Sequence, residues 1–269
     1  MSIQTKAPSL FISHGSPNFA IEPKILGSHL RKLGQQLTGI RAILVVSPHW
    51  QTQNIRVMTS EFPKTIHDFA GFSSKLYEIQ YPATGQQELA QETARLLNAA
   101  GFNTQLDANR GLDHGAWIPL LHLLPKANIP VFQVSMSLTL DTMQAAQLGR
   151  TLAPLRDQGV LIIGSGSMTH NLAEFRPGTT EISSYVQEFS AWVRKAVLTK
   201  NLESLIRYRS EAPHAQRAHP TEEHFLPLLV ALGTLYNGDT LDYIDGGVDH
   251  GILSMDSFAI GMTQLEDAA

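Results

Sequence analysis

The chain has 269 residues, of which 43% are hydrophobic and 16% are charged, and its formal net charge is −4. This length and composition indicate a globular protein with a substantial core, because disordered chains are poorer in apolar residues and richer in charge. We expect neither a nucleic acid partner nor a membrane, since there is no basic block and no apolar run near the roughly 20 residues of a bilayer span.

The N-terminal residues 1–13 lack the long apolar region and the cleavage site of a signal peptide. We therefore expect a cytoplasmic protein. The absence of cysteine excludes disulfides and thiolate metal ligands. The 11 histidines are the compositional feature that stands out, and they matter if the fold brings them together.

Apolar strand patterns alternate with amphipathic helix patterns through the first part of the chain. Ala42–Val46 is a run of five apolar, mostly branched residues, which predicts a strand buried on both faces. Ser47-Pro48 is expected to end this strand, because proline supplies no N–H to a ladder. The other elements predicted here are strands at Pro8–Ser13 and Ile55–Thr59, a helix over 21–37, and a helix that opens with a capping box at 84–87 and ends at Gly101.

Residues Glu61–Tyr81 have no clear period and contain several aromatic side chains. A long loop of this kind in a compact domain is often functional. It is equally consistent with an irregular segment that packs against the core, and the sequence leaves the two interpretations open.

Helix and strand patterns continue to the end of the chain. Asp113 is the predicted N-cap of an apolar helix at Ile118–Leu124, on which His122 is expected to be a core histidine. Thr221 is predicted to cap a further helix that has two acidic residues in its first turn. The remaining predicted elements are strands at Ile129–Ser135, Val160–Ile163, Thr240–Ile244 and Ser257–Met262, a Gly246-Gly247 turn between the last two strands, and helices at Leu140–Leu155, 181–198 and 202–208. The alternation, without linker or repeat, predicts one α/β domain over residues 1–269, with a central mixed sheet flanked by helices.

Five histidines follow predicted strands or begin predicted helices. His14, His49 and His170 each come after a strand, whereas His114 and His224 lie at helix starts. Strand ends and helix starts can share one edge of an α/β sheet, so these side chains could converge on one cleft. Neutral imidazole is a good ligand for zinc, iron and copper, and three ligands leave positions free for substrate. The alternative is that most of these residues are scattered loop histidines.

The glycine-rich stretch Gly164–Ser167 is the main competing motif. It lacks the lysine and the spacing of a phosphate-binding loop, and it does not form the pattern of a nucleophile elbow. No GxGxxG occurs in the chain, so nicotinamide and flavin binding have no support. A loop whose N–H groups hold a substrate oxygen is the more modest interpretation.

Five stretches together resemble the class III (LigB-type) extradiol ring-cleavage dioxygenases, specifically the 4,5-DOPA dioxygenase branch. They are spread over nearly the whole chain and follow the order seen in that family. The stretches are Phe11–Pro17, Val45–Trp50, Gly111–Trp117, Gly164–Asn171 and His219–Phe225.

The resemblance implies a bound divalent metal with His14, His49 and His224 as its ligands. It also implies His170 as the acid/base catalyst beside the metal and His114 as a second catalytic group that faces the substrate. Distant relatives use a glutamate in a 2-His-1-carboxylate triad, which leaves the adjacent glutamate, at position 223, as an alternative third ligand.

The same stretches contain Ser16, Trp117 and His219, which we expect to bind substrate. The implied partners are a small catechol, similar to DOPA, and O2, and the implied product is a muconic semialdehyde. We expect a monomer or a small homo-oligomer.

The metal that the resemblance implies is Fe(II) for ring cleavage, although members of the family are also found with Zn(II). Zinc has no redox chemistry, so it cannot support ring cleavage. A zinc-dependent hydrolase on the same scaffold is therefore the alternative enzyme. A binding protein that kept the fold and lost the metal is a third interpretation, and the five intact histidines argue against it.

Overall fold

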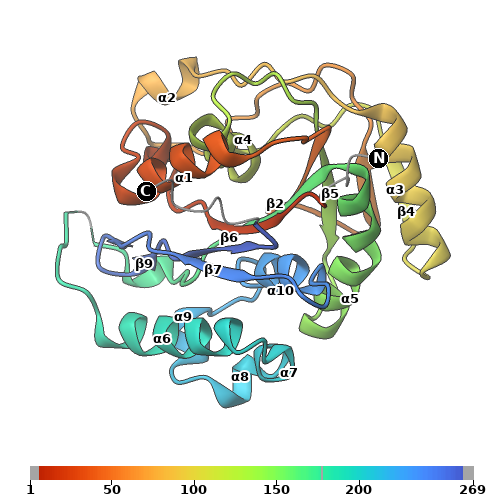
Figure 1. The fold of residues 1–269 in the computed structure, drawn as a ribbon. Coiled ribbons are helices and arrows are strands. Elements are labelled where there is room, and N and C mark those ends of the chain that lie inside the picture. Colours follow the sequence, from red (N-terminus) through yellow and green to blue (C-terminus); the bar gives the residue numbers. More distant parts are fainter. Residues whose placement is uncertain (1–5, 177, 263–269) are drawn as a thin grey trace, which may run out of the picture.

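The computed structural model describes residues 6–176 and 178–262. A mixed sheet of eight strands lies at its centre (Figure 1). Its strands lie in the order β4-β3-β5-β2-β6-β1-β10-β7. The four strands β5, β2, β6 and β1 run parallel, while β10 and β3 pair antiparallel at either side of them. The strands are β1 (Ser9–Ser13), β2 (Ala42–Thr52), β3 (Ile55–Met58), β4 (Thr104–Asp107), β5 (Val131–Ser137), β6 (Val160–Gly166), β7 (Leu241–Ile244) and β10 (Ser257–Ile260). The structure confirms the predicted α/β fold around a mixed sheet.

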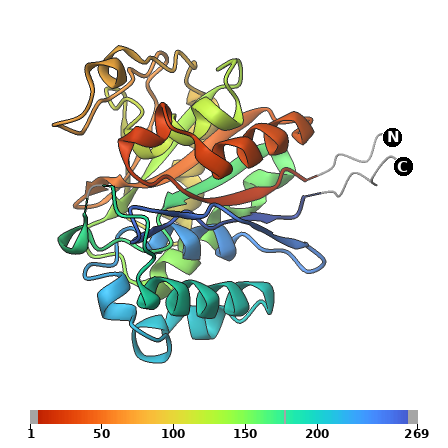
Figure 2. The same cartoon turned by 90° about the vertical axis from the view of Figure 1, so that its left-hand side faces the viewer.

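Helices cover both faces of the sheet, as Figure 2 shows from the side. One face carries α1 (Lys24–Gln36) and α4 (His114–Leu123), and the other carries α5 (Thr142–Leu152) and α10 (Leu226–Gly233). The remaining elements are the helices α2 (Ser74–Glu78), α3 (Gln87–Ala99), α6 (Ser184–Leu198), α7 (Leu202–Ile206), α8 (Tyr208–Glu211) and α9 (Ala215–Ala218), the 3-10 helices η1 (Pro17–Ala20), η2 (Ala153–Gln158) and η3 (Leu172–Glu174), and a small hairpin of β8 (Val248–Asp249) and β9 (Leu253–Ser254). No helix in the described part of the chain is long and apolar enough to cross a membrane.

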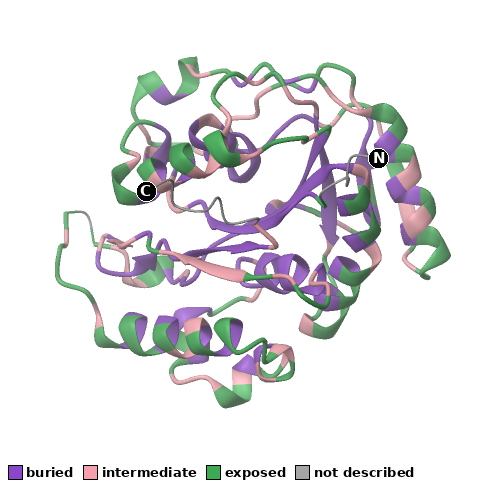
Figure 3. Cartoon of the chain, viewed as in Figure 1, coloured by how far each residue is buried: buried purple, intermediate pink, exposed green. Residues whose placement is uncertain are grey.

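The core is continuous through the parallel strands and the helices α4 and α10, which bury nearly all of their residues. Every residue of β6 and of α10 is buried, as are Ala42–Val46 in β2 (Figure 3). Strands sandwiched between helix layers have no solvent face, so they read as uninterrupted apolar runs. This packing makes the carboxyl edge of β1, β2 and β6 a rigid support for whatever side chains follow it.

The prediction that Ser47-Pro48 ends the second strand is wrong. β2 continues to Thr52, and its register against β5 shifts between Val46 and Gln51. Proline is tolerated in a strand where the ladder is interrupted, as it is at this irregularity. His49 therefore projects from an irregular part of β2 and not from a loop that follows it.

Two predicted helix starts are also wrong. The helix expected after Thr221 begins five positions later, at Leu226, because Thr221 Oγ1 donates to the Glu223 carboxylate and not to backbone N–H groups. The expected capping box at 84–87 does not form, since α3 is preceded by Gln86, which makes no side-chain cap. Short polar side chains have several local partners, and the tertiary structure selects among them.

Other local predictions agree with the structure. Asp113 caps α4 by accepting a hydrogen bond from the Ala116 N–H at 3.2 Å, and the helix starts directly at His114, earlier than the apolar pattern indicated. His122 is buried, and its Nε2–H donates to the Phe19 carbonyl oxygen at 2.8 Å. The edge strand β4 was not predicted from the sequence, because its side chains are exposed or half-buried and show no apolar alternation.

Candidate metal centre and substrate pocket

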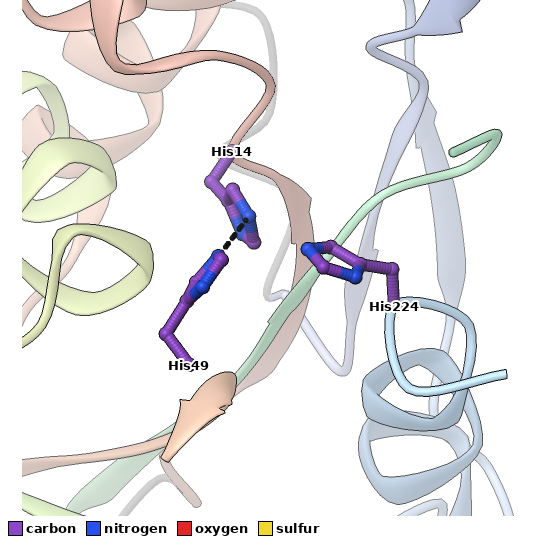
Figure 4. Close-up of side chains that lie close together, drawn as sticks. All are labelled: His14, His49 and His224. Atoms are coloured by element: carbon purple, nitrogen blue, oxygen red, sulfur yellow. Dashed lines mark hydrogen bonds between the residues drawn. The ribbon is translucent and has the colours of Figure 1, made fainter. Parts of the chain in front are cut away.

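The structure brings His14, His49 and His224 together at the carboxyl edge of the sheet (Figure 4). His14 directly follows β1, His49 projects from the irregular part of β2, and His224 lies in the turn before α10. Nε2 of His14 and Nε2 of His49 are 3.0 Å apart, and one ring nitrogen from each of the three residues lies within 4.8 Å of the others. Three imidazoles from distant parts of the chain thus point toward one position.

The hydroxyl of Ser165 defines which nitrogen of His14 is free. Ser165 donates its one proton to the carbonyl oxygen of Gly115, so it accepts a hydrogen bond from Nδ1–H of His14, at 3.0 Å. His14 must then carry its ring proton on Nδ1. Its Nε2, which faces His49, keeps a lone pair that is available to a cation.

Glu223 orients His224 as Ser165 orients His14, by accepting the proton on Nδ1. Its Oε1 lies 3.0 Å from Nδ1 of His224, so the carboxylate accepts the ring N–H, and the other ring nitrogen points toward His14 and His49 (Figure 4). Glu223 is close enough to share an ion with His170 and His224, but among the described residues it does not group with the first two histidines. A carboxylate that orients a ligating histidine from behind is a common feature of metal sites.

Burial keeps the three imidazoles neutral. It is the largest cause that lowers the pKa of His14 and His224 well below 6.5, and neighbouring histidines lower both further. Burial also lowers the pKa of His49 to about 4, with a further contribution from His114, although the Asp113 and Asp68 carboxylates act in the opposite direction. Neutral nitrogens that face one another fit a divalent metal that accepts imidazole, such as zinc or iron, better than calcium or magnesium.

His170 and His114 flank these three residues. The ring of His170 stacks on that of His224, with centroids 3.6 Å apart and an interplanar angle of 9°. Burial lowers the pKa of His170, and Glu223 opposes that shift. The ring of His114 lies 3.8 Å from that of His49, centroid to centroid, so both residues are next to the convergent nitrogens.

Asp68 is a site residue that the sequence did not single out. Its Oδ1 accepts the backbone N–H of His114 at 2.9 Å and lies 3.0 Å from Nδ1 of that histidine, and its Oδ2 is 3.9 Å from Nδ1 of His49. Burial raises the pKa of this carboxyl, but hydrogen bonds and charge from His114 outweigh it and lower the pKa to about 2. Asp68 belongs to Glu61–Tyr81, whose irregular pattern was the available signal, so the functional interpretation of that segment is supported.

A cavity of about 340 Å³ opens over the histidines. Ser16, which we expected to bind substrate, lies in its wall, and Gly15 beside it has a φ of +60°, the left-handed conformation that suits glycine in a sharp turn. The residues that line the cavity are His14, Gly15, Ser16, Pro17, Asn18, His49, Phe69, Phe72, His114, His170, Leu172, Phe175, His224, His250 and Leu253. An inner end of histidines and an outer wall rich in aromatic and aliphatic side chains suit a small aromatic ligand.

Trp117 and His219, which we expected to bind substrate, lie behind this wall and do not line it. Trp117 has no exposed surface, and its Nε1–H donates to the carbonyl oxygen of Ile66 at 3.0 Å. His219 is fully buried, and its Nε2–H donates to the carbonyl oxygen of Met168 at 2.9 Å. Each is bonded to a backbone segment that leads to a residue of the cavity wall, Phe69 or His170. His250, between β8 and β9, lines the cavity instead, although nothing in its local sequence indicated this.

Comparison with known proteins identifies the family. The family model of the catalytic LigB subunit of aromatic ring-opening dioxygenase matches residues 11–245. A 4,5-DOPA dioxygenase extradiol of Beta vulgaris is 40% identical over 261 residues, covering 95% of this chain and 97% of the relative. The protein of that name in Escherichia coli K12 is 36% identical and covers 96% of both chains. The crystal structure of an uncharacterised protein of Escherichia coli K12 superimposes with a TM-score of 0.79, at 31% identity over 95% of this chain and 100% of the other.

The α/β fold with its cluster of buried histidines is thus the scaffold of an aromatic ring-opening dioxygenase, and the chain belongs to the LigB family of these enzymes. Its full-length relatives are extradiol dioxygenases of the 4,5-DOPA type, and this protein is an extradiol dioxygenase related to them. The resemblance stated from the sequence motifs is confirmed.

Proposed function

We propose that this enzyme opens the ring of a catechol with O2 to give a muconic semialdehyde, with one divalent metal held by His14, His49 and His224. The observation that carries the proposal is the arrangement of the three imidazoles. They are neutral and convergent, and two of them are oriented from behind by Ser165 and Glu223. DOPA is the first catechol to test, because it appears in the names of the relatives.

When bound, Fe(II) would supply the electron sharing with oxygen that ring opening needs, which zinc cannot do. The chain's own residues would bind the catechol and move its protons. His170 is neutral because burial lowers its pKa, so it can accept a phenolic proton and later return one. His114, held by Asp68 beside His49, would orient the second hydroxyl. Phe69 and Phe175 would contact the ring and exclude water from it.

The test is reconstitution of metal-free protein with Fe(II) or Zn(II) under anaerobic conditions. After oxygen is admitted, we expect the iron form to consume it in the presence of a catechol and to form a yellow product. The zinc form should bind the catechol and consume no oxygen. His49→Ala, treated in the same way, is the control for iron that is not held in the site.

The opposite pattern would overturn the proposal. An inert iron form beside a zinc form that hydrolyses an ester or an amide would favour the zinc-dependent hydrolase. A cytoplasmic location and a monomer or small homo-oligomer stay predictions, to be checked by cell fractionation and by light scattering.

A further inference from the structure

The cavity has two chemically different ends. The inner end holds the histidines, where the two hydroxyls of a catechol must lie under the proposed function. The outer wall is formed by apolar side chains, which are those of Phe69, Phe72, Leu172, Phe175 and Leu253. Because the hydroxyls and the opposite side of the ring point in different directions, the substituent of a bound catechol must lie against this outer wall.

The outer wall offers no fixed charge to a substituent. Among the described residues that line the cavity, none is Lys, Arg, Asp or Glu, and the polar ones outside the histidine cluster are Ser16, Asn18 and His250. Serine, asparagine and a neutral imidazole can donate or accept hydrogen bonds, but they cannot neutralise a carboxylate or an ammonium group.

The charged residues that flank Phe69 and Phe175 in the chain are Asp68, Glu174 and Arg176, and each has a hydrogen-bond partner. Arg217 makes two hydrogen bonds to the Glu174 carboxylate, at 2.8 and 2.9 Å. Arg176 is exposed, and it donates to the carbonyl oxygen of Phe175 at 2.8 Å. Asp68 accepts the backbone N–H of His114, as described above. The Glu174 and Asp68 carboxylates therefore already have hydrogen-bond partners, and Arg176 does not line the cavity.

We infer that the preferred substrate is a catechol whose ring substituent is uncharged and apolar, such as an alkyl or aryl group, and that an amino acid catechol such as DOPA is a poor substrate. This inference rests on the proposed ring cleavage and narrows its substrate class. A charge placed in an apolar pocket loses its hydration without gaining a partner, whereas an alkyl chain gains by leaving water.

Four catechols with side chains of similar length test the inference. They are 4-propylcatechol, which is uncharged, 3-(3,4-dihydroxyphenyl)propionate, which is anionic, dopamine, which is cationic, and DOPA, which carries both charges. The iron form should show a kcat/KM for 4-propylcatechol about 10–100-fold above that for DOPA, which corresponds to one unpaired charged group in a partly open pocket. All assays are run at pH 8, above the ordinary imidazole pKa of about 6.5, where a free imidazole carries no charge.

Binding provides a second measurement that does not depend on turnover. Titration calorimetry with the zinc form should give the same order of affinities, with 4-propylcatechol tightest. Equal or tighter binding of DOPA would overturn the inference.

A variant that adds a positive charge to the wall should gain activity on an anionic catechol, which tests the inference in the opposite direction. Leu172 lines the cavity but is 58% exposed, so Leu172→Arg is compatible with folding. It should raise the kcat/KM for the propionate, relative to that for 4-propylcatechol, by about tenfold, the discrimination that one new ion pair in a shielded pocket provides. The matched control is Leu138→Arg, at a leucine 62% exposed that does not line the cavity, and it should leave the ratio unchanged.

The outcomes separate this inference from the proposed function. If the iron form cleaves none of the four catechols, the proposed function fails and takes the inference with it. If it cleaves DOPA as well as or better than 4-propylcatechol, ring cleavage stands and the inference is wrong. An unchanged ratio in Leu172→Arg would also contradict it, because the substituent would then not lie against this wall.

Discussion

At the scale of residues, the candidate metal centre depends on groups behind the histidines as much as on the histidines themselves. Ser165 assigns the ring proton of His14 to Nδ1, and Glu223 does the same for His224. Both leave a lone pair on the nitrogen that faces the centre. The open question from the sequence, whether Glu223 or His224 is the third ligand, thus has a geometric proposal: His224 binds the metal and Glu223 positions it.

Glu223→Gln tests this assignment. The amide oxygen can still accept the Nδ1–H of His224, but the negative charge is lost, so metal affinity should fall by about 10–100-fold without disappearing. His224→Gln should abolish tight binding. Competition with a chromophoric chelator measures both, and complete loss of metal in Glu223→Gln would identify the glutamate as the ligand.

His170→Ala separates acid/base catalysis from metal binding. His170 stacks on His224, and we propose that it moves protons and does not ligate the metal. The variant should keep its iron and lose about 10²–10⁴-fold in turnover. Metal analysis and oxygen uptake on the same sample give the two numbers. Release of the iron would show that His170 is itself a ligand.

At the scale of elements, His49 is placed by the contact between β2 and the start of α4. Asp113, which caps α4, accepts hydrogen bonds from Ser47 at 2.7 Å and from Gln133 and Arg110 at 2.9 Å each. The Ser47 bond holds the irregular part of β2 against the start of the helix. A strand irregularity that aims one side chain is a recurrent device next to functional sites.

Gly115→Ala should disturb this contact. A methyl group there would collide with Ser47 Oγ and would lie 3.0 Å from Cδ2 of His49, so the imidazole must shift. We expect metal affinity to fall by about tenfold, as it does when the groups that orient a ligand are displaced, together with about 1–3 kcal/mol of stability. The control is Gly85→Ala, which collides with the carbonyl oxygen of Ser60 away from the histidines. It should lose stability and keep the affinity, and equal affinities in both variants would contradict the role of this contact.

At the scale of the whole molecule, the parallel centre of the sheet gathers residues from both ends of the chain at one edge. β1 and β2 carry His14 and His49 to this edge, and the buried α10 anchors the turn that carries His224. The same packing buries histidines that are not part of the centre, such as His122 and His219. Burial of these neutral side chains connects the stability of the fold to pH.

Metal-free protein should become less stable as pH falls below about 6.5. Burial lowers the pKa of His219 to about 3 and also lowers that of His122. The unfolded chain then binds protons that the folded chain refuses, so stability is complete above the unfolded pKa and declines toward the folded one. A histidine as buried as His219 should lower the free energy of unfolding by about 1 kcal/mol at pH 5.5.

Urea unfolding of the metal-free protein at pH 7.5 and 5.5 measures this loss. His219→Gln keeps a donor for the Met168 carbonyl oxygen but does not titrate, so the drop in unfolding free energy between the two pH values should be smaller in the variant. An identical drop would remove His219 from the explanation.

Features that depend on near neighbours in the chain could be predicted from the amino-acid sequence. The apolar run Ala42–Val46 predicted the buried part of β2, and Asp113 was predicted to cap the helix that follows it, as it does. The alternation of such segments predicted the α/β fold, and the motifs around the histidines predicted the family.

The surroundings of those histidines depend on the fold and could not be predicted from the sequence. The tautomer of His14 depends on a chain of hydrogen bonds from Ser165 to Gly115, and the presence of His250 in the cavity wall depends on how the β8–β9 hairpin packs. Trp117 and His219 occur in the same motifs as the site residues but do not line the cavity, and each is bonded to a backbone carbonyl oxygen. The physical reason is that the direction and protonation of a side chain are determined by contacts between residues far apart in the chain, which local sequence patterns do not encode.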